Sequence, residues 1–423
     1  MKTIFPVFIL LLGAMAPLAA LEPAPAAAEL TWENCVKEAL ANNPALKAKK
    51  LAIDQYKYLY FAGYNSYLPK ISVSHSVARS GGENTDPSNR WGLSLSASEP
   101  VFNLAAMSSI RTAKISYDKT FSDYKVQSAS LRQTLYSAFM TLVAAQEQVR
   151  VDSRTLAIRE ENAKLIRLKY ESGQESRGNM LYTAALFELS RINAAKSGRS
   201  LQIARRELLR NMGISEYRPV TARGALTAPE LNFNAETLLT ILDNLPQVVS
   251  QKKSVESQKE RLLTAKYDLF PVVSANQSMS WSGPGQFDVD RSWSLGLSMS
   301  LPLLSGGLTY YPNSTKAARL ALKGAEESLK DLKLSLGNSI LNGYENFLNA
   351  RDTADANISV VAACEERYKE SQIKYMAGKI SFTDLTNVEQ NMVDAQQNQL
   401  QYLRNANNSK FALENLLGVG LED

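Results

Sequence analysis

Four short segments of the chain alternate strictly between apolar and small polar residues. In the first half they are 71–77 and 91–98, and in the second half 273–281 and 293–301. A period of two residues is typical of a β-strand whose two faces differ. Residues 81–89, between the first two segments, are polar and rich in turn formers, so they predict a loop. Each half of the chain is therefore expected to contain one β-hairpin.

A much longer segment of helical character follows each pair of strands. From Leu104 to Ser172 the sequence has neither glycine nor proline, and a continuous helix of that length would measure about 100 Å. Its apolar residues step by four and three, which predicts a coiled-coil seam. The predicted seam consists of Leu131, Leu135, Ala138, Leu142, Ala145, Val149, Leu156, Ala163, Ile166 and Tyr170, and of Leu336, Ile340, Gly343, Phe347, Ala350, Ala354, Val361, Cys364, Tyr368 and Tyr375 in the second half.

Each long helix is expected to turn back on itself. Turns at 173–178 and 378–383 lead into return helices over 179–212 and 384–417. Before the strands, shorter helices are expected, the first of them capped by Thr31 and the second spanning 45–67.

The two halves of the chain repeat one another. The stretch 168–173 returns at 373–378, an offset of 205 positions, while Pro44 and Pro246 are offset by 202. An insertion of three residues near 305–313 reconciles the two offsets. Long similar halves indicate a tandem duplication rather than an array of short repeats. The predicted organisation is a signal peptide over 1–20, a first repeat over 30–213 (β-hairpin 70–100, helical hairpin 104–212), a linker over 214–232, a second repeat over 233–418 (β-hairpin 271–302, helical hairpin 313–417) and a tail over 419–423.

The N-terminus predicts export from the cytoplasm. A basic start, an apolar run and small residues form a signal peptide, with cleavage after Ala20 or after Ala28. No later apolar run reaches 18 residues, so no transmembrane helix is expected. Cys35 and Cys364 occupy non-equivalent places in the two halves and are both interpreted as buried thiols; their spacing does not require a disulfide.

The strands have features of a membrane sheet. Each approaches the roughly 9–11 residues that cross a bilayer, and Trp91, Trp281 and Trp293 fall near strand ends, where interfacial aromatic residues gather. A soluble sheet is the alternative. Four strands cannot close a barrel, because the smallest membrane barrels have eight. The predicted fold is therefore α+β, with long coiled-coil helical hairpins and four transmembrane strands per chain, and a trimer completes a twelve-stranded β-barrel continued by an α-helical barrel.

The order of these features resembles the TolC-type outer membrane efflux protein family. The resemblance rests on Leu68-Pro69 and Phe270-Pro271 before the hairpins, the stretch 302–307 after the last strand, the Tyr-x-x-Gly turns and the duplication. It implies a homotrimeric channel of the bacterial outer membrane whose helical portion lies in the periplasm. Such a channel contacts outer membrane lipid and docks with a periplasmic adaptor and an inner membrane pump of RND or ABC type, for efflux or type I secretion.

The resemblance also implies a gate where the helices turn. Tyr375 and Asp384 match the gate positions of the family, whereas Asn179 and Asn387 stand where the family has aspartates. Three copies of Asp384 around an axis would repel one another, which is expected to raise the pKa of each carboxyl. Asp384 is equally suited to the first turn of its helix.

The two turns themselves have an expected role. Gly173 and Gly378 are expected to be left-handed helix C-caps. The exposed turns, which also include Gly178 and Lys379, are expected to contact the adaptor.

Little in the sequence suggests catalysis or ligand binding. His75 is the one histidine, and no His, Cys, Asp or Glu cluster has metal-ligand spacing. The charge of +5 is scattered, which gives no support for nucleic-acid binding. We therefore expect no enzyme activity, no cofactor and no metal. The alternatives to a channel are a soluble periplasmic coiled-coil adaptor or chaperone, and a surface stalk without a lumen.

Overall fold

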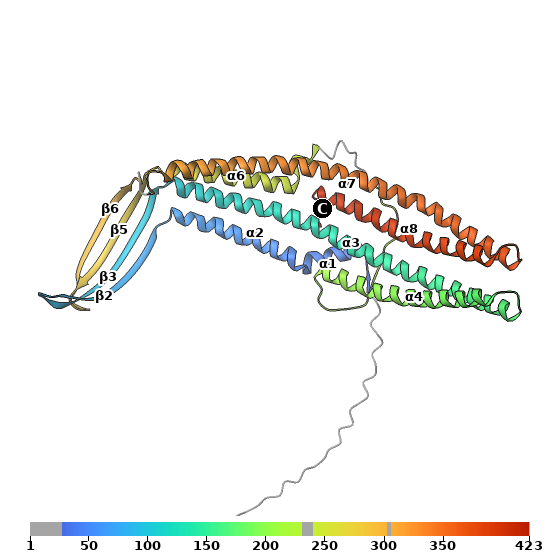
Figure 1. The fold of residues 1–423 in the computed structure, drawn as a ribbon. Helices are drawn as coiled ribbons and strands as arrows, with labels where there is room; N and C mark the ends of the chain where they lie inside the picture. The colour runs from blue at the N-terminus through green and yellow to red at the C-terminus, as the bar shows by residue number, and fades with distance from the viewer. Residues whose placement is uncertain (1–27, 231–239, 303–305, 423) are drawn as a thin grey trace, which may run out of the picture.

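A four-stranded sheet and two long helical hairpins lie end to end along an elongated molecule (Figure 1). The computed structural model describes residues 28–230, 240–302 and 306–422. The predicted signal peptide therefore lies outside the described residues, apart from Ala28. The first half contains β1 (Ala28–Leu30), α1 (Trp32–Asn42), α2 (Pro44–Gly63), the 3-10 turn η1 (Tyr64–Ser66), β2 (Lys70–Gly82), β3 (Thr85–Phe102), α3 (Leu104–Glu171) and α4 (Arg177–Met212). The second contains β4 (Val220–Ala222), η2 (Leu242–Asn244), α6 (Pro246–Tyr267), β5 (Val272–Gly283), β6 (Asp290–Ser300), α7 (Tyr310–Met376) and α8 (Phe382–Leu416).

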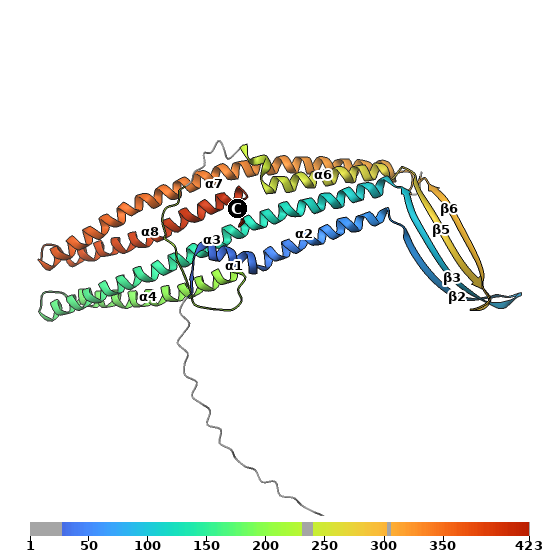
Figure 2. The same cartoon turned by 180° about the vertical axis from the view of Figure 1, so that it is seen from behind.

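The helices form two antiparallel hairpins, α3 with α4 and α7 with α8. Helices α3 and α7 have 68 and 67 residues, so each is about 100 Å long. Near the sheet, α2 and α6 lie alongside the long helices, and both hairpins end side by side at the opposite end of the molecule (Figure 2). Among the described residues, no helix combines the length and the apolar character needed to cross a membrane.

The four long strands form one antiparallel sheet in the order β2-β3-β5-β6. The register aligns residues of one type across all four strands. One row contains Val73, Leu95, Met279 and Trp293. The neighbouring row contains Ser74, Ser94, Ser280 and Ser292. The period of two predicted from the sequence thus gives one apolar face and one face of hydroxyl groups.

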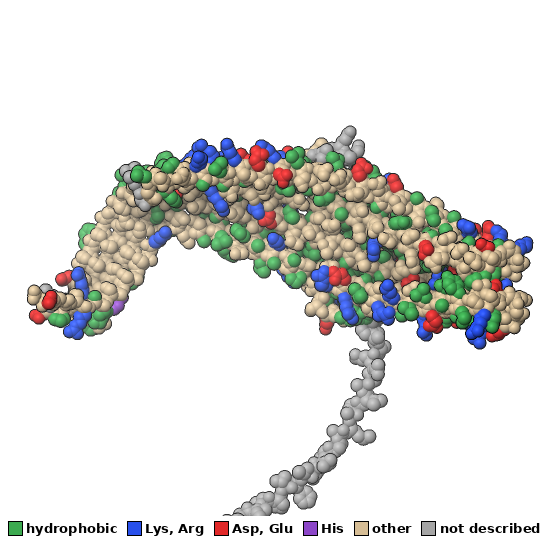
Figure 3. Space-filling view, viewed as in Figure 1, with side chains coloured by type: hydrophobic (Ala, Val, Ile, Leu, Met, Phe, Trp, Pro, Cys, Tyr) green, Lys and Arg blue, Asp and Glu red, His purple; other side chains and the backbone are tan. Residues whose placement is uncertain are grey.

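Hydroxyl groups pair across the strands on the polar face. The Oγ atoms of Ser72 and Ser96 lie 2.7 Å apart, and those of Ser278 and Ser294 lie 2.8 Å apart. Asn276 donates to the Oγ of Ser298 at 2.8 Å. These side chains are small and uncharged, and the sheet is largely free of charged groups between its ends (Figure 3).

The predicted loop over 81–89 is wrong. Strand β3 begins at Thr85, and Gly82 pairs with Thr85, so the turn is tight and the hairpin longer than expected. Polar residues satisfy an antiparallel ladder as well as apolar ones do, because the ladder uses backbone groups. Polarity therefore marks where an apolar face ends, and not where a strand ends.

The predicted seam is mostly buried in the second hairpin, where Gly343, Ala350 and Cys364 are half-buried, and it is partly wrong in the first. Leu131, Leu135 and Leu142 are buried, as expected. Nearer the turn, however, Tyr170 is exposed, and the buried residues of α3 are mostly polar. They are Asp152, Thr155, Arg159, Asn162 and Ile166, at helical steps of three and four. The apolar pattern missed Arg159 and Asn162 because these side chains pair with polar partners on α7 and α8.

Helix ends differ slightly from the predictions. Thr31 caps α1 as expected, since its side chain accepts from the N–H of Asn34 at 3.3 Å. Helix α2 ends at Gly63, earlier than predicted, and η1 follows. Helix α7 begins at Tyr310 rather than at 313, because Pro312 sits in its first turn, where a missing N–H is tolerated.

The apolar core lies where α1 packs against α3 and α4. Cys35 and Ala39 of α1 are fully buried there, together with Leu208 of α4. Cys364 was also predicted to be buried, but it is half-buried at the margin of a second cluster near the hairpin turns. Both cysteines are free.

Two features of the core region were not expected. Strand β1 pairs in parallel with β4, which lies in the predicted linker 214–232. Gly213 has a φ of +82°, and a Cβ there would lie 2.5 Å from the backbone oxygen of Asn42. The end of α4 therefore packs directly against the end of α1.

Candidate functional site

Both helical hairpins turn through left-handed glycines, as predicted. The φ angles of Gly173 and Gly378 are +75° and +69°. At the first turn, Gly173 donates to the carbonyl of Tyr170 at 2.9 Å, and Gln174 donates to that of Lys169 at 2.7 Å. Lys379 and Gly378 make the same two bonds at the second turn. These pairs of bonds satisfy the last carbonyls of each long helix. We call the region 169–180 and 374–387 the tip.

Each return helix begins with a serine cap. Ser176 accepts from the N–H of Asn179 at 3.1 Å, and Ser381 accepts from that of Asp384 at 3.1 Å. The Asp384 carboxylate in turn accepts from the N–H and the hydroxyl of Ser381, at 3.2 and 2.7 Å. This reciprocal arrangement is a capping box.

The tip also joins the two hairpins. The Tyr375 ring is 3 % exposed, and its hydroxyl donates to the carboxylate of Glu175 on the other hairpin. Asn179 donates to the second oxygen of Glu175 at 2.8 Å. The Lys169 Nζ lies 4.2 Å from the centroid of the Tyr375 ring. Of the predicted gate residues, Tyr375 and Asn179 are thus brought together through Glu175, which the sequence reading missed.

The remaining predicted tip residues are exposed. Gly178 lies in the first turn of α4, Lys379 follows the second turn, and Asn387 lies on α8. Asp384, in the first turn of α8, is also exposed.

Within one chain, hydrogen bonds favour the ionised forms of two carboxyls at the tip, Asp384 and Glu175. Hydrogen bonds from the side chain and backbone of Ser381 lower the pKa of Asp384. Burial opposes ionisation of Glu175, but hydrogen bonds from Tyr375 and Asn179 outweigh it and lower the pKa of that carboxyl. Burial and the neighbouring Glu175 raise the pKa of the Tyr375 hydroxyl. The rise expected for Asp384 requires neighbouring copies, so it stays a prediction, and the direction within one chain is the opposite.

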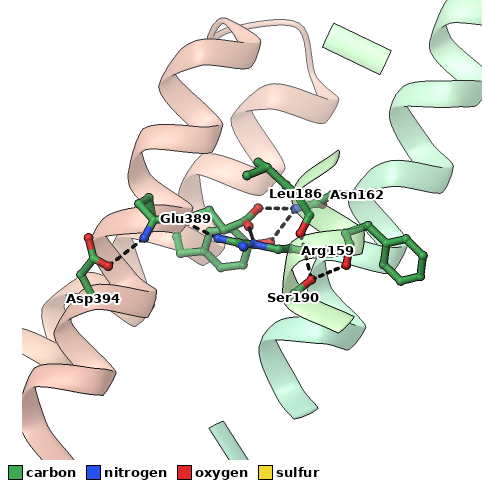
Figure 4. A network of polar contacts seen from close by, with 9 residues as sticks. Arg159, Asn162, Leu186, Ser190, Glu389 and Asp394 are labelled. Carbon is green, nitrogen blue, oxygen red and sulfur yellow. Dashed lines mark hydrogen bonds and ion pairs between the residues drawn. The ribbon is translucent and has the colours of Figure 1, made fainter. Parts of the chain in front are cut away.

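A second polar contact between the hairpins lies above the tip (Figure 4). Arg159 of α3 donates to Glu389 of α8, with 3.0 Å between Nε and Oε1, and to Gln390 at 2.9 Å. Asn162 donates to the other oxygen of Glu389 at 2.6 Å and lies 3.4 Å from the Tyr368 hydroxyl of α7. We call Arg159, Asn162, Glu389 and Tyr368 the polar node. All four are less than 10 % exposed.

The three predicted interface tryptophans lie close together at the end of the sheet remote from the helices. Trp91 pairs with Gly283, Trp281 with Arg291, and Trp293 with Met279, which places them in three successive rows of the apolar face. Trp293 is 73 % exposed. No group of three or more His, Cys, Asp or Glu residues in the described ranges is arranged to hold a metal ion.

Comparisons with known proteins agree with this architecture. The chain matches the family of outer membrane efflux proteins over residues 35–213 and 238–419, one segment in each half. It is 24 % identical over 385 residues to the alkaline protease secretion protein AprF of Pseudomonas aeruginosa, covering 85 % of this chain and 77 % of that protein.

Solved structures share the fold. The CmeC outer membrane channel of Campylobacter jejuni matches with a TM-score of 0.82 at 16 % identity, over 91 % of this chain and 85 % of that one. The MtrE outer membrane channel of Neisseria gonorrhoeae, in its open state, matches with a TM-score of 0.80 at 19 % identity, over 92 % and 89 %. CusC matches with a TM-score of 0.82 at 15 % identity, over 92 % of each chain. The family match over both halves confirms the family predicted from the order of strands, turns and repeats, and the chain belongs to the outer membrane efflux protein family.

Proposed function

We propose that this protein is the outer membrane exit duct of a tripartite efflux or type I secretion system. The observation that carries the proposal is an amphipathic sheet with two open edges, β2 and β6. Within lipid an unpaired strand edge costs several kcal/mol for each unsatisfied backbone group, so a membrane sheet must close. Three copies supply twelve strands, and each β6 edge pairs with the β2 edge of the next copy.

The face of hydroxyl groups suits a water-filled lumen. Its serines satisfy one another laterally, as in the pairs Ser74–Ser94 and Ser280–Ser292, both at 2.7 Å. The rows that contain Ser72 and Ser74 consist of serine on all four strands, and such small side chains leave a twelve-stranded barrel filled with water rather than with a packed core. This supports a conduit over a stalk without a lumen.

The apolar face suits lipid better than water. On β6, Trp293, Leu295, Leu297 and Met299 are between 71 and 76 % exposed, and no helix covers them in the described chain. A soluble adaptor or chaperone would leave this patch in water. Contiguous apolar patches of this kind mark membrane or protein contacts. The sheet is therefore assigned to the outer membrane, and the helices to the periplasm.

The tip turns face the proposed partners. Gly173, Gly178, Gly378 and Lys379 lie at the end of the molecule furthest from the sheet, where a periplasmic adaptor and an inner membrane pump would dock. The name of AprF refers to protease secretion, which favours an ABC-type pump, whereas the CmeC and MtrE structures are described only as outer membrane channels. Cross-linking at Lys379 followed by identification of the captured pump distinguishes the two systems.

The bond between Tyr375 and Glu175 is assigned to the closed gate. It ties the two hairpins together at the tip, and when they separate, water can replace the lost hydrogen bond at both groups. Asn179 supports Glu175, while three copies of Asp384 form an acidic ring that favours cations. Asn387 lies one turn further along α8, on the exposed side.

Single-channel recording in planar bilayers tests both the duct and its gate. We expect the purified protein to be a heat-modifiable trimer that conducts, and Tyr375→Phe to conduct more because the bond to Glu175 is lost. Tyr170 is the matched control, because it occupies the equivalent position in the first hairpin and is exposed there. Tyr170→Phe is expected to behave as the parent. A monomer soluble without detergent would refute the duct, and equal conductance of both variants would refute the gate.

A further inference from the structure

Two ion pairs join α3 and α8, and a third polar contact joins the two hairpins at the tip. Furthest from the tip, Arg132 and Glu414 lie 2.9 Å apart. The polar node follows at Arg159, which is 27 residues, or about 40 Å, closer to the tip. The bond from Tyr375 to Glu175 at the tip is the third. Because α3 belongs to the first hairpin and α8 to the second, these two ion pairs hold the halves together, alongside hydrogen bonds such as that from Tyr136 to Asn407.

The polar node is the strongest of these contacts by its geometry. Both oxygens of Glu389 accept hydrogen bonds from α3, one from Arg159 and one from Asn162, and Tyr368 connects the node to α7. The Arg159 and Glu389 side chains are 7 and 5 % exposed. Separating a buried pair of this kind leaves two charges unpaired away from water, which is costly. In the bond at the tip only Glu175 is charged, and it is half-buried.

The node is not inherited from the duplication. Positions 205 residues from Arg159 and Glu389 hold Cys364 and Ala184, and those from Arg132 and Glu414 hold Gly337 and Leu209. These residues carry no charge, so the equivalent surfaces of α7 and α4 cannot form either ion pair. These two ion pairs are therefore specific to the interface between α3 and α8 within one chain.

We propose that the polar node is the fulcrum of tip opening. The two hairpins separate below it when the bond between Tyr375 and Glu175 breaks, and they stay joined above it. Arg159 lies 12 residues before the end of α3, so the separating segment is about 18 Å long. The inference rests on the proposed gate. Arg159 and Glu389 are then positioning residues, because the ion pair between them sets how far from the tip the two hairpins separate.

Pulsed electron paramagnetic resonance on spin-labelled, detergent-purified protein tests this inference. One label pair, Glu171→Cys with Lys379→Cys, reports below the node, and another, Arg150→Cys with Asn398→Cys, reports above it. All four positions are exposed. Cys364→Ser removes the half-buried native thiol, while Cys35 can stay because it is fully buried.

Three comparisons decide the outcome. The lower distance joins the labels at positions 171 and 379, and the upper distance joins those at 150 and 398. In Tyr375→Phe, the lower distance is expected to lengthen and the upper one to stay unchanged. Adding Arg159→Ala with Glu389→Ala, which removes both charges together, is expected to lengthen the upper distance too. The matched control, Arg132→Ala with Glu414→Ala in the same Tyr375→Phe background, is expected to leave the upper distance unchanged because the node is intact.

The milder variant Asn162→Ala guards against misfolding. It removes one donor to Glu389. In the Tyr375→Phe background it is expected to broaden the distribution of upper distances, but less than removal of Arg159 and Glu389 does. An upper distance that lengthens in Tyr375→Phe alone, or that stays fixed without the node, would overturn the inference. The recordings of conductance on the same samples judge the duct separately, so a conducting trimer with the wrong distances refutes the fulcrum alone.

Discussion

Charge placed on the apolar face of the sheet gives a sharp test of its position in lipid. Leu297 lies within β6 on that face and is 76 % exposed in one chain. An arginine in mid-bilayer on a lipid-facing strand costs about 2–4 kcal/mol. A trimer carries three copies of Leu297→Arg, so the total cost is about 6–12 kcal/mol, which exceeds or rivals the net stability of many folded proteins.

The neighbouring residue provides a control of matched charge. Gly296 precedes Leu297 and points to the face of hydroxyl groups, and a Cβ there would meet no atom within 4 Å. Gly296→Arg therefore adds the same charge at the same depth, but toward the proposed lumen. We expect it to assemble as the parent does.

The assay is the amount of heat-modifiable trimer in the outer membrane, compared at equal expression. Leu297→Arg is expected to lower it severely, and Gly296→Arg is not. Parental levels of trimer in Leu297→Arg would refute the assignment of this face to lipid. Loss of trimer in Gly296→Arg alone would mean that the two faces have been exchanged.

Three further predictions concern the helical part. A left-handed alanine costs about 1–2 kcal/mol, and Gly173→Ala should cost only that amount because open space surrounds it. Gly213→Ala is expected to cost more, because its Cβ would meet the backbone at the end of α1. Thermal unfolding of the two variants compares these costs. The pKa of Glu175 is lowered from 4.5, so its ionised form stabilises the closed tip fully above pH 4.5, and this stabilisation is lost as the pH falls further. Conductance should therefore be constant between pH 7 and 5.5 and rise in stronger acid. Burial raises the pKa of the Cys35 thiol to about 12, so a maleimide should label Cys35 only after unfolding. Cys364 is half-buried and should be labelled in the folded protein. Rapid labelling of the folded Cys364→Ser variant would contradict the packing of α1.

Local features of the tip could be predicted from the sequence. Gly173 and Gly378 adopt the left-handed conformation, and Asp384 completes a cap, because each depends on residues within a few positions along the chain. The alternating strands were found for the same reason, since the period of two is visible without knowledge of the partner strand. Their ends were not, because backbone pairing continues through polar residues such as Thr85.

Contacts between distant segments could not be predicted in this way. Arg159 and Glu389 are 230 positions apart, and each alone resembles a charged residue on a solvated helix face. Glu175 was missed because its role depends on Tyr375 from the other hairpin. The apolar pattern also placed Tyr170 on the seam, although the structure buries Arg159 and Asn162 instead. Apolar periodicity detects a buried face only where its partners are apolar too.

The small parallel pair of β1 and β4 has a consequence for the order of assembly. The partner of Ala28 is Val220, so almost the whole first repeat forms the crossover between the two strands. A parallel pair cannot form until its crossover is complete. The first repeat is thus fastened at both ends by its own chain, and the pairing of Leu30 with Ala222 brings its two ends together only after every residue between them has been synthesised.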